Sequence, residues 1–186
     1  GKIFLNMMQD TFQKTPYGGS VIGDVADLKS LTREELLQFH KDFYVPNNAI
    51  VVVVGDVDKD DIFDWAEKYY GPLKANEKLT EFKKSKETRE LYRHKTRWGR
   101  RIKLNGNTEV PMFMVAYKGE PIGTRKGFAM DLLSSLLSGG QSSYFNQLYV
   151  DGKSPRLASI SVSNYTLKHN GVFFISGELL KGQGLN

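Results

Sequence analysis

Apolar residues recur along this chain at two spacings, and each spacing predicts a different kind of element. Repeats of three and four positions are typical of helices, and β-branched or alternating runs are typical of strands. The segments that we expect to be helical are about 2–13, 33–44, 59–70, 125–137 and 143–150. The segments that we expect to be strands are about 49–55, 97–104, 111–118, 157–164 and 171–178. Paired strands in the second half favour an α+β fold.

Local signals mark the starts of two helices. Thr32 can cap the helix that follows it, and Glu35 can return a hydrogen bond, which together make a capping box. Asp58 is the expected cap of the next helix and lies within an acidic turn, 56–61. The alternating acids of this turn are also compatible with a Ca²⁺ site, but the glycine and the distal glutamate of a calcium loop are missing. Helix capping explains the cluster without a metal.

Three stretches decide the expected architecture. The run AIVVVVG at 49–55 lacks polar alternation, so we expect a central strand that is buried on both faces. The stretch before Ser30 is glycine-spotted and polar, which indicates a loop, and residues 74–93 are charged and lack a clean period, which indicates a linker. We therefore expect an antiparallel or mixed sheet with helices packed on one face.

The composition excludes several kinds of chemistry. The 186 residues include no cysteine, which excludes disulfides, thiolate metal sites and cysteine nucleophiles. No apolar run approaches the ~20 residues that span a bilayer, so no membrane span is expected. The net charge is +5, and residues 83–103 hold ten Lys or Arg against two acids. Tyr92 and Trp98 there are compatible with nucleic-acid binding, but no nucleic-acid fold signature accompanies them, so a solvated linker and strand edge is favoured.

A series of motifs extends over nearly the whole chain. G-x-x-x-D-[LI]-x-x-[LI]-T-x-x-[DE]-[LI]-x-x-[FY] is followed by Y-x-P-N-N, by a valine-rich strand that ends G-D-x-D, and by a helix that ends Y-[FY]-G. The residues that fill these patterns are Gly23, Asp27, Leu28, Leu31, Thr32, Glu35, Leu36, Phe39, Tyr44, Pro46, Asn47, Asn48, Gly55, Asp56, Asp58, Tyr70 and Gly71. Segments 111–117 and 131–149 continue the match. The series resembles the insulinase-like zinc peptidases, the pitrilysin and mitochondrial-processing-peptidase family.

The resemblance implies zinc chemistry that this chain does not carry. The family's active domain has an inverted zinc motif, H-x-x-E-H, whose glutamate is the general base, and a third glutamate ligand downstream. The only histidines are His40, His94 and His169, and no two of them stand three or four positions apart. The pattern of His40 on an apolar helix face favours a core histidine, and His169 is expected in an exposed loop. We expect zinc in the intact parent and none bound by this chain.

The resemblance also implies how the chain is organised. Residues 1–73 correspond to the C-terminal part of the first half of an insulinase-like domain, 74–95 to a linker, and 96–186 to the second half without its last helix. The expected fold is therefore an incomplete insulinase-like metalloendopeptidase fold. The expected function is a fragment of a zinc-dependent endopeptidase that hydrolyses peptides with a metal-activated water. This piece would be scaffold and peptide-binding wall, without a catalytic residue.

Candidate substrate contacts lie after the helix expected at 125–137. They are Gly139, Gly140, Gln141 and Ser142. In the family the corresponding loop helps to anchor the peptide's N-terminal end, and the same residues also read as a helix C-cap followed by a serine N-cap. In the family's partner domain, an arginine and a tyrosine seven residues later hold substrate. Here Tyr149 and Arg156 stand in the reverse order, which favours origin in the zinc-bearing half.

A second function remains open, namely a non-catalytic partner or structural-assembly domain of the same family. The sequence upstream of residue 1 discriminates the two, because H-x-x-E-H there would indicate a peptidase. The expected partners are a peptide or protein substrate, other domains or a partner subunit of the same family, and a second copy of the chain, with no nucleic acid. The sequence assigns no compartment, and the periplasm or cytoplasm of a bacterium is the first expectation.

Overall fold

The structure is a computed structural model, and it describes residues 1–92 and 99–184. The chain divides into two compact units. The first comprises Gly1–Val21 and Arg89–Asn186, and the second comprises Ile22–Thr88. Within the described residues, no helix combines the length and the apolar character that crossing a bilayer requires.

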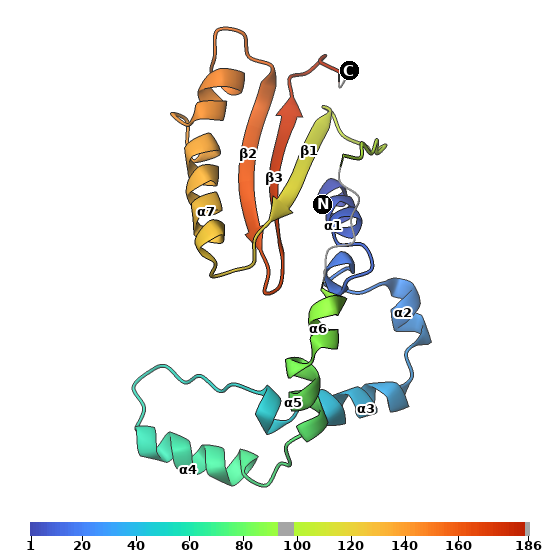
Figure 1. Ribbon diagram of the computed structural model, residues 1–186, viewed down its shortest axis with the longest axis vertical. Coiled ribbons are helices and arrows are strands. Elements are labelled where there is room, and N and C mark those ends of the chain that lie inside the picture. Colours follow the sequence, from blue (N-terminus) through green and yellow to red (C-terminus); the bar gives the residue numbers. More distant parts are fainter. Residues whose placement is uncertain (93–98, 185–186) are drawn as a thin grey trace. The chain divides into compact units, whose positions relative to one another are not determined.

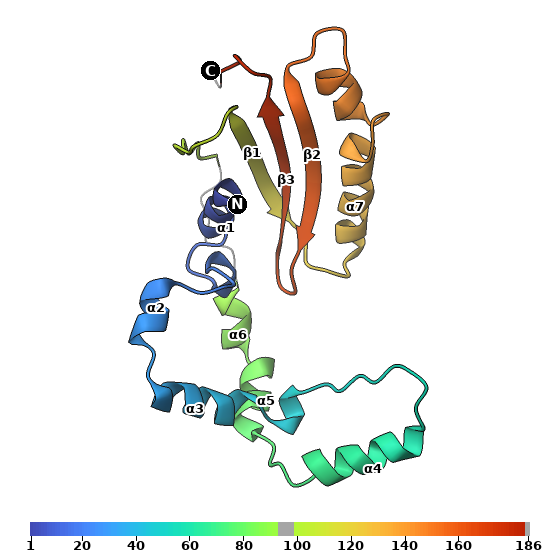
Figure 2. The same cartoon turned by 180° about the vertical axis from the view of Figure 1, so that it is seen from behind.

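A three-stranded antiparallel sheet forms the centre of the first unit (Figure 1). Its strands are β1 (Met112–Gly119), β2 (Leu157–Thr166) and β3 (Gly171–Leu179). Their order is β1-β3-β2, so Ile175 of β3 pairs with Val115 on one side and with Val162 on the other. Figure 2 shows the same order from behind. The three strands expected after residue 110, and the α+β class, are therefore confirmed.

The core of this unit lies between the sheet and α1 (Lys2–Thr11). Phe12 and Val172 are fully buried, and Phe174 packs beside them. The ring of Phe4 stands edge-on to Phe174, with 5.8 Å between the ring centroids. Aromatic pairs favour this arrangement because the positive edge of one ring meets the negative face of the other. The apolar residues whose spacing predicted a helix at 2–13 thus supply the core.

The helix α7 (Arg125–Ser138) lies along β2 and is attached to it by side-chain hydrogen bonds. The Asn164 amide nitrogen donates to the backbone oxygen of Gly127 at 3.0 Å. The hydroxyl of Ser138 accepts from the backbone N–H of Val162 at 2.7 Å. This second bond satisfies a backbone donor at the outer edge of β2, where there is no further strand within the described residues.

The helices cover both faces of the sheet. Successive side chains of a strand point to opposite faces, and directly paired residues share a face. Asn164, which is bonded to α7, pairs with Phe173, whereas α1 packs on the neighbouring Val172 and Phe174. The expectation that the helices lie on one face is therefore wrong. The apolar pattern shows which side of a helix is apolar, but it contains nothing about which face of the sheet the helix covers.

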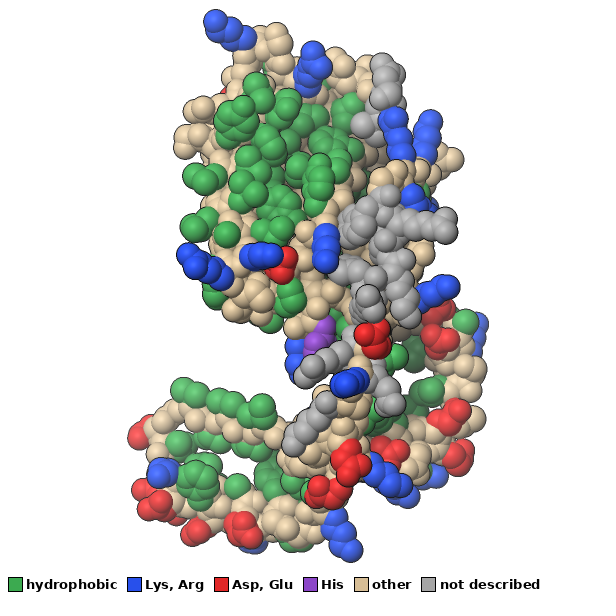
Figure 3. All heavy atoms as spheres, viewed as in Figure 1, with side chains coloured by type: hydrophobic (Ala, Val, Ile, Leu, Met, Phe, Trp, Pro, Cys, Tyr) green, Lys and Arg blue, Asp and Glu red, His purple; other side chains and the backbone are tan. Residues whose placement is uncertain are grey.

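The apolar stripe that predicted α7 points largely to solvent. Leu132 and Leu136 are 69% and 71% exposed, and Phe128 is exposed as well. Figure 3 shows apolar side chains gathered over α7 and the sheet. The helix meets β2 through the small residues Gly127 and Ser138 instead. The helix itself is confirmed, and its apolar side is left without a covering element within the described residues.

The second unit is helical, and two of its helices begin at the caps that the sequence predicts. Its helices are α2 (Val25–Ser30), α3 (Arg33–Phe43), α4 (Lys59–Tyr70) and α5 (Glu77–Lys84), and α6 (Lys86–Leu91) spans the boundary between the units. A short 3-10 helix lies at Pro46–Asn48 in this unit, and another lies at Pro16–Gly18 in the first unit. The Thr32 hydroxyl accepts from the Glu35 N–H at 3.2 Å, and the Glu35 carboxylate accepts from the Thr32 N–H at 2.8 Å. Asp58 accepts from the Asp60 N–H at 2.8 Å. Both predicted caps are confirmed.

Three helices form where the sequence indicates a loop and a linker, α2 in the expected loop and α5 and α6 in the expected linker. The Asp24 carboxylate caps α2 by accepting from the Ala26 N–H at 2.9 Å, and the Asn76 side chain caps α5 by accepting from the Leu79 N–H at 3.3 Å. Asn76 is itself held by Asn47, whose amide donates to the Asn76 backbone oxygen at 2.8 Å. A cap and one turn suffice for helices this short, and such segments contain too few apolar residues to show a period.

Two expected strands are absent. Residues 49–55 form no strand, and Val52 and Val54 are 77% and 92% exposed, so the prediction of a buried central strand is wrong. A strand needs hydrogen-bonding partners on neighbouring chain, and the described residues of 22–88 supply no second strand. Of the strand expected at 97–104, residues 97 and 98 lie outside the described residues, and 99–104 form no strand.

Candidate functional site

The turn after α7 contains the four residues expected to contact substrate, Gly139, Gly140, Gln141 and Ser142. Gly139 ends the helix, and its N–H donates to the backbone oxygen of Ser135 at 2.7 Å. Gly140 has a φ of +124°, a conformation that other residues rarely adopt. The expected helix C-cap is therefore confirmed at Gly139, and glycine is favoured at the second position. The expected serine N-cap is wrong, because Phe145 is the N-cap of the next helix and makes no side-chain cap bond.

Some backbone groups of this turn have hydrogen-bond partners within the chain, and others do not. The Gly140 carbonyl accepts from the Ser143 N–H at 3.0 Å, from the Ser143 hydroxyl at 2.6 Å and from the Asn146 amide at 3.0 Å. The N–H groups of Gln141 and Ser142 have no acceptor among the described residues, and both residues are exposed. The turn therefore offers two backbone donors from a rigid support. Whether a peptide binds there remains a prediction.

A π-helix follows the turn. It runs over Asn146–Val150, and the Asp151 N–H closes it by donating to the Asn146 backbone oxygen at 2.9 Å. The short helix expected near 143–150 is thus present in a wider form. π-Helical turns are rare and occur often at functional sites, because the extra residue redirects the side chains of the turn.

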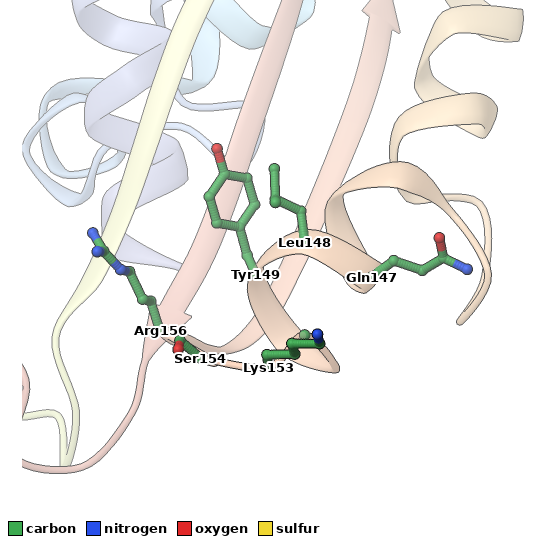
Figure 4. A pocket seen from close by; sticks show the side chains of 7 residues that line it. Gln147, Leu148, Tyr149, Lys153, Ser154 and Arg156 are labelled. Atoms are coloured by element: carbon green, nitrogen blue, oxygen red, sulfur yellow. The ribbon is translucent and has the colours of Figure 1, made fainter.

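The π-helix and the loop that leads to β2 line an open pocket of about 490 Å³ (Figure 4). Its polar lining comes from Gln147, Tyr149, Lys153, Ser154 and Arg156. The Arg156 N–H donates to the Tyr149 backbone oxygen at 2.9 Å, which places these two residues side by side. The structure therefore brings together Tyr149 and Arg156, which stand in the reverse order of the family's arginine and tyrosine. Sequence reasoning did not identify Lys153 as part of this pocket.

The two described histidines, His40 and His169, belong to no metal-binding group of described residues. Among the described residues, no group of three or more His, Cys, Asp or Glu side chains is placed to hold a metal ion. His40 is exposed and stacks on Tyr44, with 4.7 Å between the ring centroids. The interpretation of His40 as a core histidine is wrong, because the described part of the chain leaves the His40 side of the helix exposed. His94 lies outside the described residues.

His169 belongs to an aromatic cluster that sequence reasoning missed. Its ring stacks on Tyr92 with 4.6 Å between the ring centroids, and its backbone N–H donates to the Tyr17 hydroxyl at 3.3 Å. Burial raises the pKa of Tyr17, the neighbouring Tyr92 adds to the rise, and the hydrogen bond from His169 opposes it. The three residues are distant in sequence, so no local pattern could have linked them.

Comparisons with known proteins identify relatives. The family model described as "Peptidase M16 inactive domain" matches residues 30–182. "Zinc protease PqqE" of Helicobacter pylori is 32% identical over 182 residues, which covers 95% of this chain and 39% of that protein. "Uncharacterized zinc protease YmxG" of Bacillus subtilis is 25% identical over 97% of this chain and 42% of that protein. The chain thus spans about two fifths of the length of these relatives.

Solved structures agree on the fold. A protease from Helicobacter pylori matches with a TM-score of 0.70 at 22% identity, over 98% of this chain and 43% of that one. A peptidase M16 inactive domain from Pseudomonas fluorescens matches with a TM-score of 0.66 at 16% identity, over 96% and 41%. A chain of complex III2 from Candida albicans matches at 0.65 and 15% identity, over 96% and 42%. The family model matches most of this chain, residues 30–182. The chain therefore belongs to the M16 peptidase family, as its motifs predict.

Proposed function

We propose that this chain is a non-catalytic, substrate-contacting part of a zinc-dependent endopeptidase, and that the intact protein hydrolyses peptides with a zinc-activated water. The observation that carries the proposal is the match of residues 30–182 to the inactive domain of the M16 family. Two relatives named as zinc proteases support the reaction class. The zinc would be held by residues outside this sequence, because the sequence contains no H-x-x-E-H.

The turn at 139–142 supports the role in substrate contact. The N–H groups of Gln141 and Ser142 are the kind of donors that bind peptide carbonyl oxygens, as they do at strand edges and in backbone nests. The three hydrogen bonds to the Gly140 carbonyl hold the turn in place, so little ordering is needed when a peptide binds.

Zinc binding and peptide contact can be tested separately. After dialysis, the 186-residue chain should hold far less than one zinc per molecule and should not cleave a fluorogenic peptide. Stoichiometric zinc would contradict the assignment of the metal to absent chain. For peptide contact, Gln141 is replaced by the photo-crosslinker p-benzoylphenylalanine, and the matched control carries it at the exposed Lys126 of α7. Crosslinks to an octapeptide at position 141 and not at 126 are expected, and equal yields would count against the turn.

A partner or structural-assembly subunit of the same family is the second candidate. The observation that favours it is the fold likeness to a chain of complex III2 from Candida albicans. The sequence of the intact protein separates the two candidates. An intact H-x-x-E-H ahead of residue 1 supports the peptidase, and a degenerate version supports the assembly role.

A further inference from the structure

The charged residues that line the pocket beside the π-helix are all cations. Two of its lining residues, Lys153 and Arg156, are cations, and none of the lining residues is an acid. The nearest acid in sequence, Asp151, does not line the pocket. Gln147, Tyr149 and Ser154 complete a lining that is rich in hydrogen-bond donors. Such a surface favours a negatively charged ligand.

The backbone of this pocket is held at several points. The Arg156 N–H is bonded to the Tyr149 oxygen at 2.9 Å, and the Arg156 oxygen accepts from the Leu180 N–H at 3.4 Å. Gly152 lies so close to the π-helix that an added Cβ would be 2.8 Å from the Gln147 backbone oxygen. Figure 4 shows Arg156 and Tyr149 extending to the same side of the loop. The guanidinium is therefore carried on a fixed loop, although its tip is exposed to solvent.

The side chains match a carboxylate. A guanidinium presents a planar fork of donors that fits the two oxygens of a carboxylate. Lys153 extends away from Arg156 in Figure 4, so its ammonium adds attraction at longer range and not a second contact to the same carboxylate. The ring of Tyr149 and the side chain of Leu148 supply apolar surface for the carbon atoms that carry the carboxylate. We infer that this pocket binds a carboxylate group of the peptide substrate, and so selects acidic peptides or free peptide C-termini. The inference rests on the proposed function, which supplies the peptide.

Four labelled octapeptides test the inference and distinguish the two sources of a carboxylate. They share a neutral sequence with a central Glu or Gln, and each is made with a free or an amidated C-terminus. Binding to the 186-residue chain is followed by fluorescence anisotropy at low salt. The peptide with the recognised carboxylate should bind about tenfold more tightly than the Gln amide, the size expected for one exposed charge-assisted contact.

Substitutions assign the preference to the pocket. Arg156→Gln should remove most of the preference, and Arg156→Lys should keep part of it because the charge remains without the fork. Lys126→Gln on α7 removes one exposed cation outside the pocket and should leave the preference unchanged. This control separates local recognition from the general attraction of a basic chain, which also weakens as salt rises.

Each alternative outcome has a definite meaning. Equal binding of all four peptides, or a preference that survives Arg156→Gln, overturns the inference and leaves the proposed function standing. Failure to bind any peptide overturns both. A single-stranded RNA that binds more tightly than the best peptide, and does so through Arg156, overturns the peptide assignment in favour of a phosphate ligand.

Discussion

At the residue scale, hydrogen bonds between near neighbours in sequence set the local chemistry. The Glu35 carboxylate accepts from the Thr32 N–H at 2.8 Å and from the Thr32 hydroxyl at 2.8 Å. These bonds favour the ionised form, so they lower the pKa of Glu35, the backbone bond contributing most. Because donor and acceptor are three positions apart, the sequence alone was sufficient to predict the pair.

The capping box should make the helicity of α3 depend on pH. With the pKa of Glu35 lowered in the folded chain, its stabilising effect is complete above the ordinary glutamate pKa of about 4.3 and is lost as the pH falls through the lowered value. A carboxyl-detected NMR titration should find Glu35 below the usual range. Thr32→Ala should return the pKa of Glu35 toward that range. A Glu35 pKa that stays as low in the variant as in the unsubstituted chain would contradict the assignment.

Close backbone approach at Gly171 gives a second prediction at this scale. A Cβ added there would lie 2.9 Å from the Glu120 backbone nitrogen and closer still to the Glu120 oxygen. Gly171→Ala should therefore destabilise the first unit by about 1–3 kcal/mol, since the backbone cannot move aside cheaply. Gly106→Ala is the matched control, because its nearest neighbour is the Thr108 methyl at 4.0 Å. Urea unfolding followed by circular dichroism measures both, and equal midpoints would refute the steric argument.

At the scale of elements, some features could be predicted from local sequence and others could not. The starts of α3 and α4 were predictable because each cap and its acceptor lie within one turn. The β2–β3 hairpin was predictable from two adjacent alternating runs. The strand expected at 49–55 depends on partners elsewhere in the chain, which its own residues do not specify. The contact of α7 through Gly127 and Ser138, and not through its leucines, was likewise invisible to an apolar period.

The hydrogen bond between α7 and β2 can be tested by removing one atom, the hydroxyl oxygen of Ser138. Ser138→Ala removes the acceptor of the Val162 N–H, which costs about 1 kcal/mol locally when a partly buried donor loses its partner. The Val162 amide should then exchange its hydrogen several-fold faster by NMR. Ser135→Ala, an exposed position on the same helix, should leave that rate unchanged. No change at Val162 in the first variant would show that water replaces the hydroxyl without cost.

At the scale of the whole chain, the candidate site was only partly predictable. The turn at 139–142 was found because its glycines and serines follow an apolar helix. The pocket was not found, because its charge depends on a loop that returns Arg156 to Tyr149. A usable signal was present, since Lys153 and Arg156 follow a glycine within five positions. What the sequence lacked was the position of the loop's side chains relative to the π-helix.

Exposed apolar surface should make the chain self-associate. Residues 50–54 are five consecutive exposed β-branched residues without a charge, a pattern that promotes intermolecular strand pairing. Light scattering should show a mass that rises with concentration. Val52→Asp should suppress the rise, whereas Val21→Asp, at a still more exposed valine outside the run, should not. A clean monomer of the unsubstituted chain at high concentration would refute this prediction.

The position of β3 between β1 and β2 has a consequence for biosynthesis. Translation delivers β1 and β2 before β3, yet each of them has its ladder of hydrogen bonds with β3. The sheet of β1, β2 and β3 cannot assemble on the ribosome until residues 171–179 have left the exit tunnel, and closing the long interval from β1 slows the step further. During that delay the nascent strands are substrates for chaperones, so the rate at which β3 emerges sets how long β1 and β2 need protection.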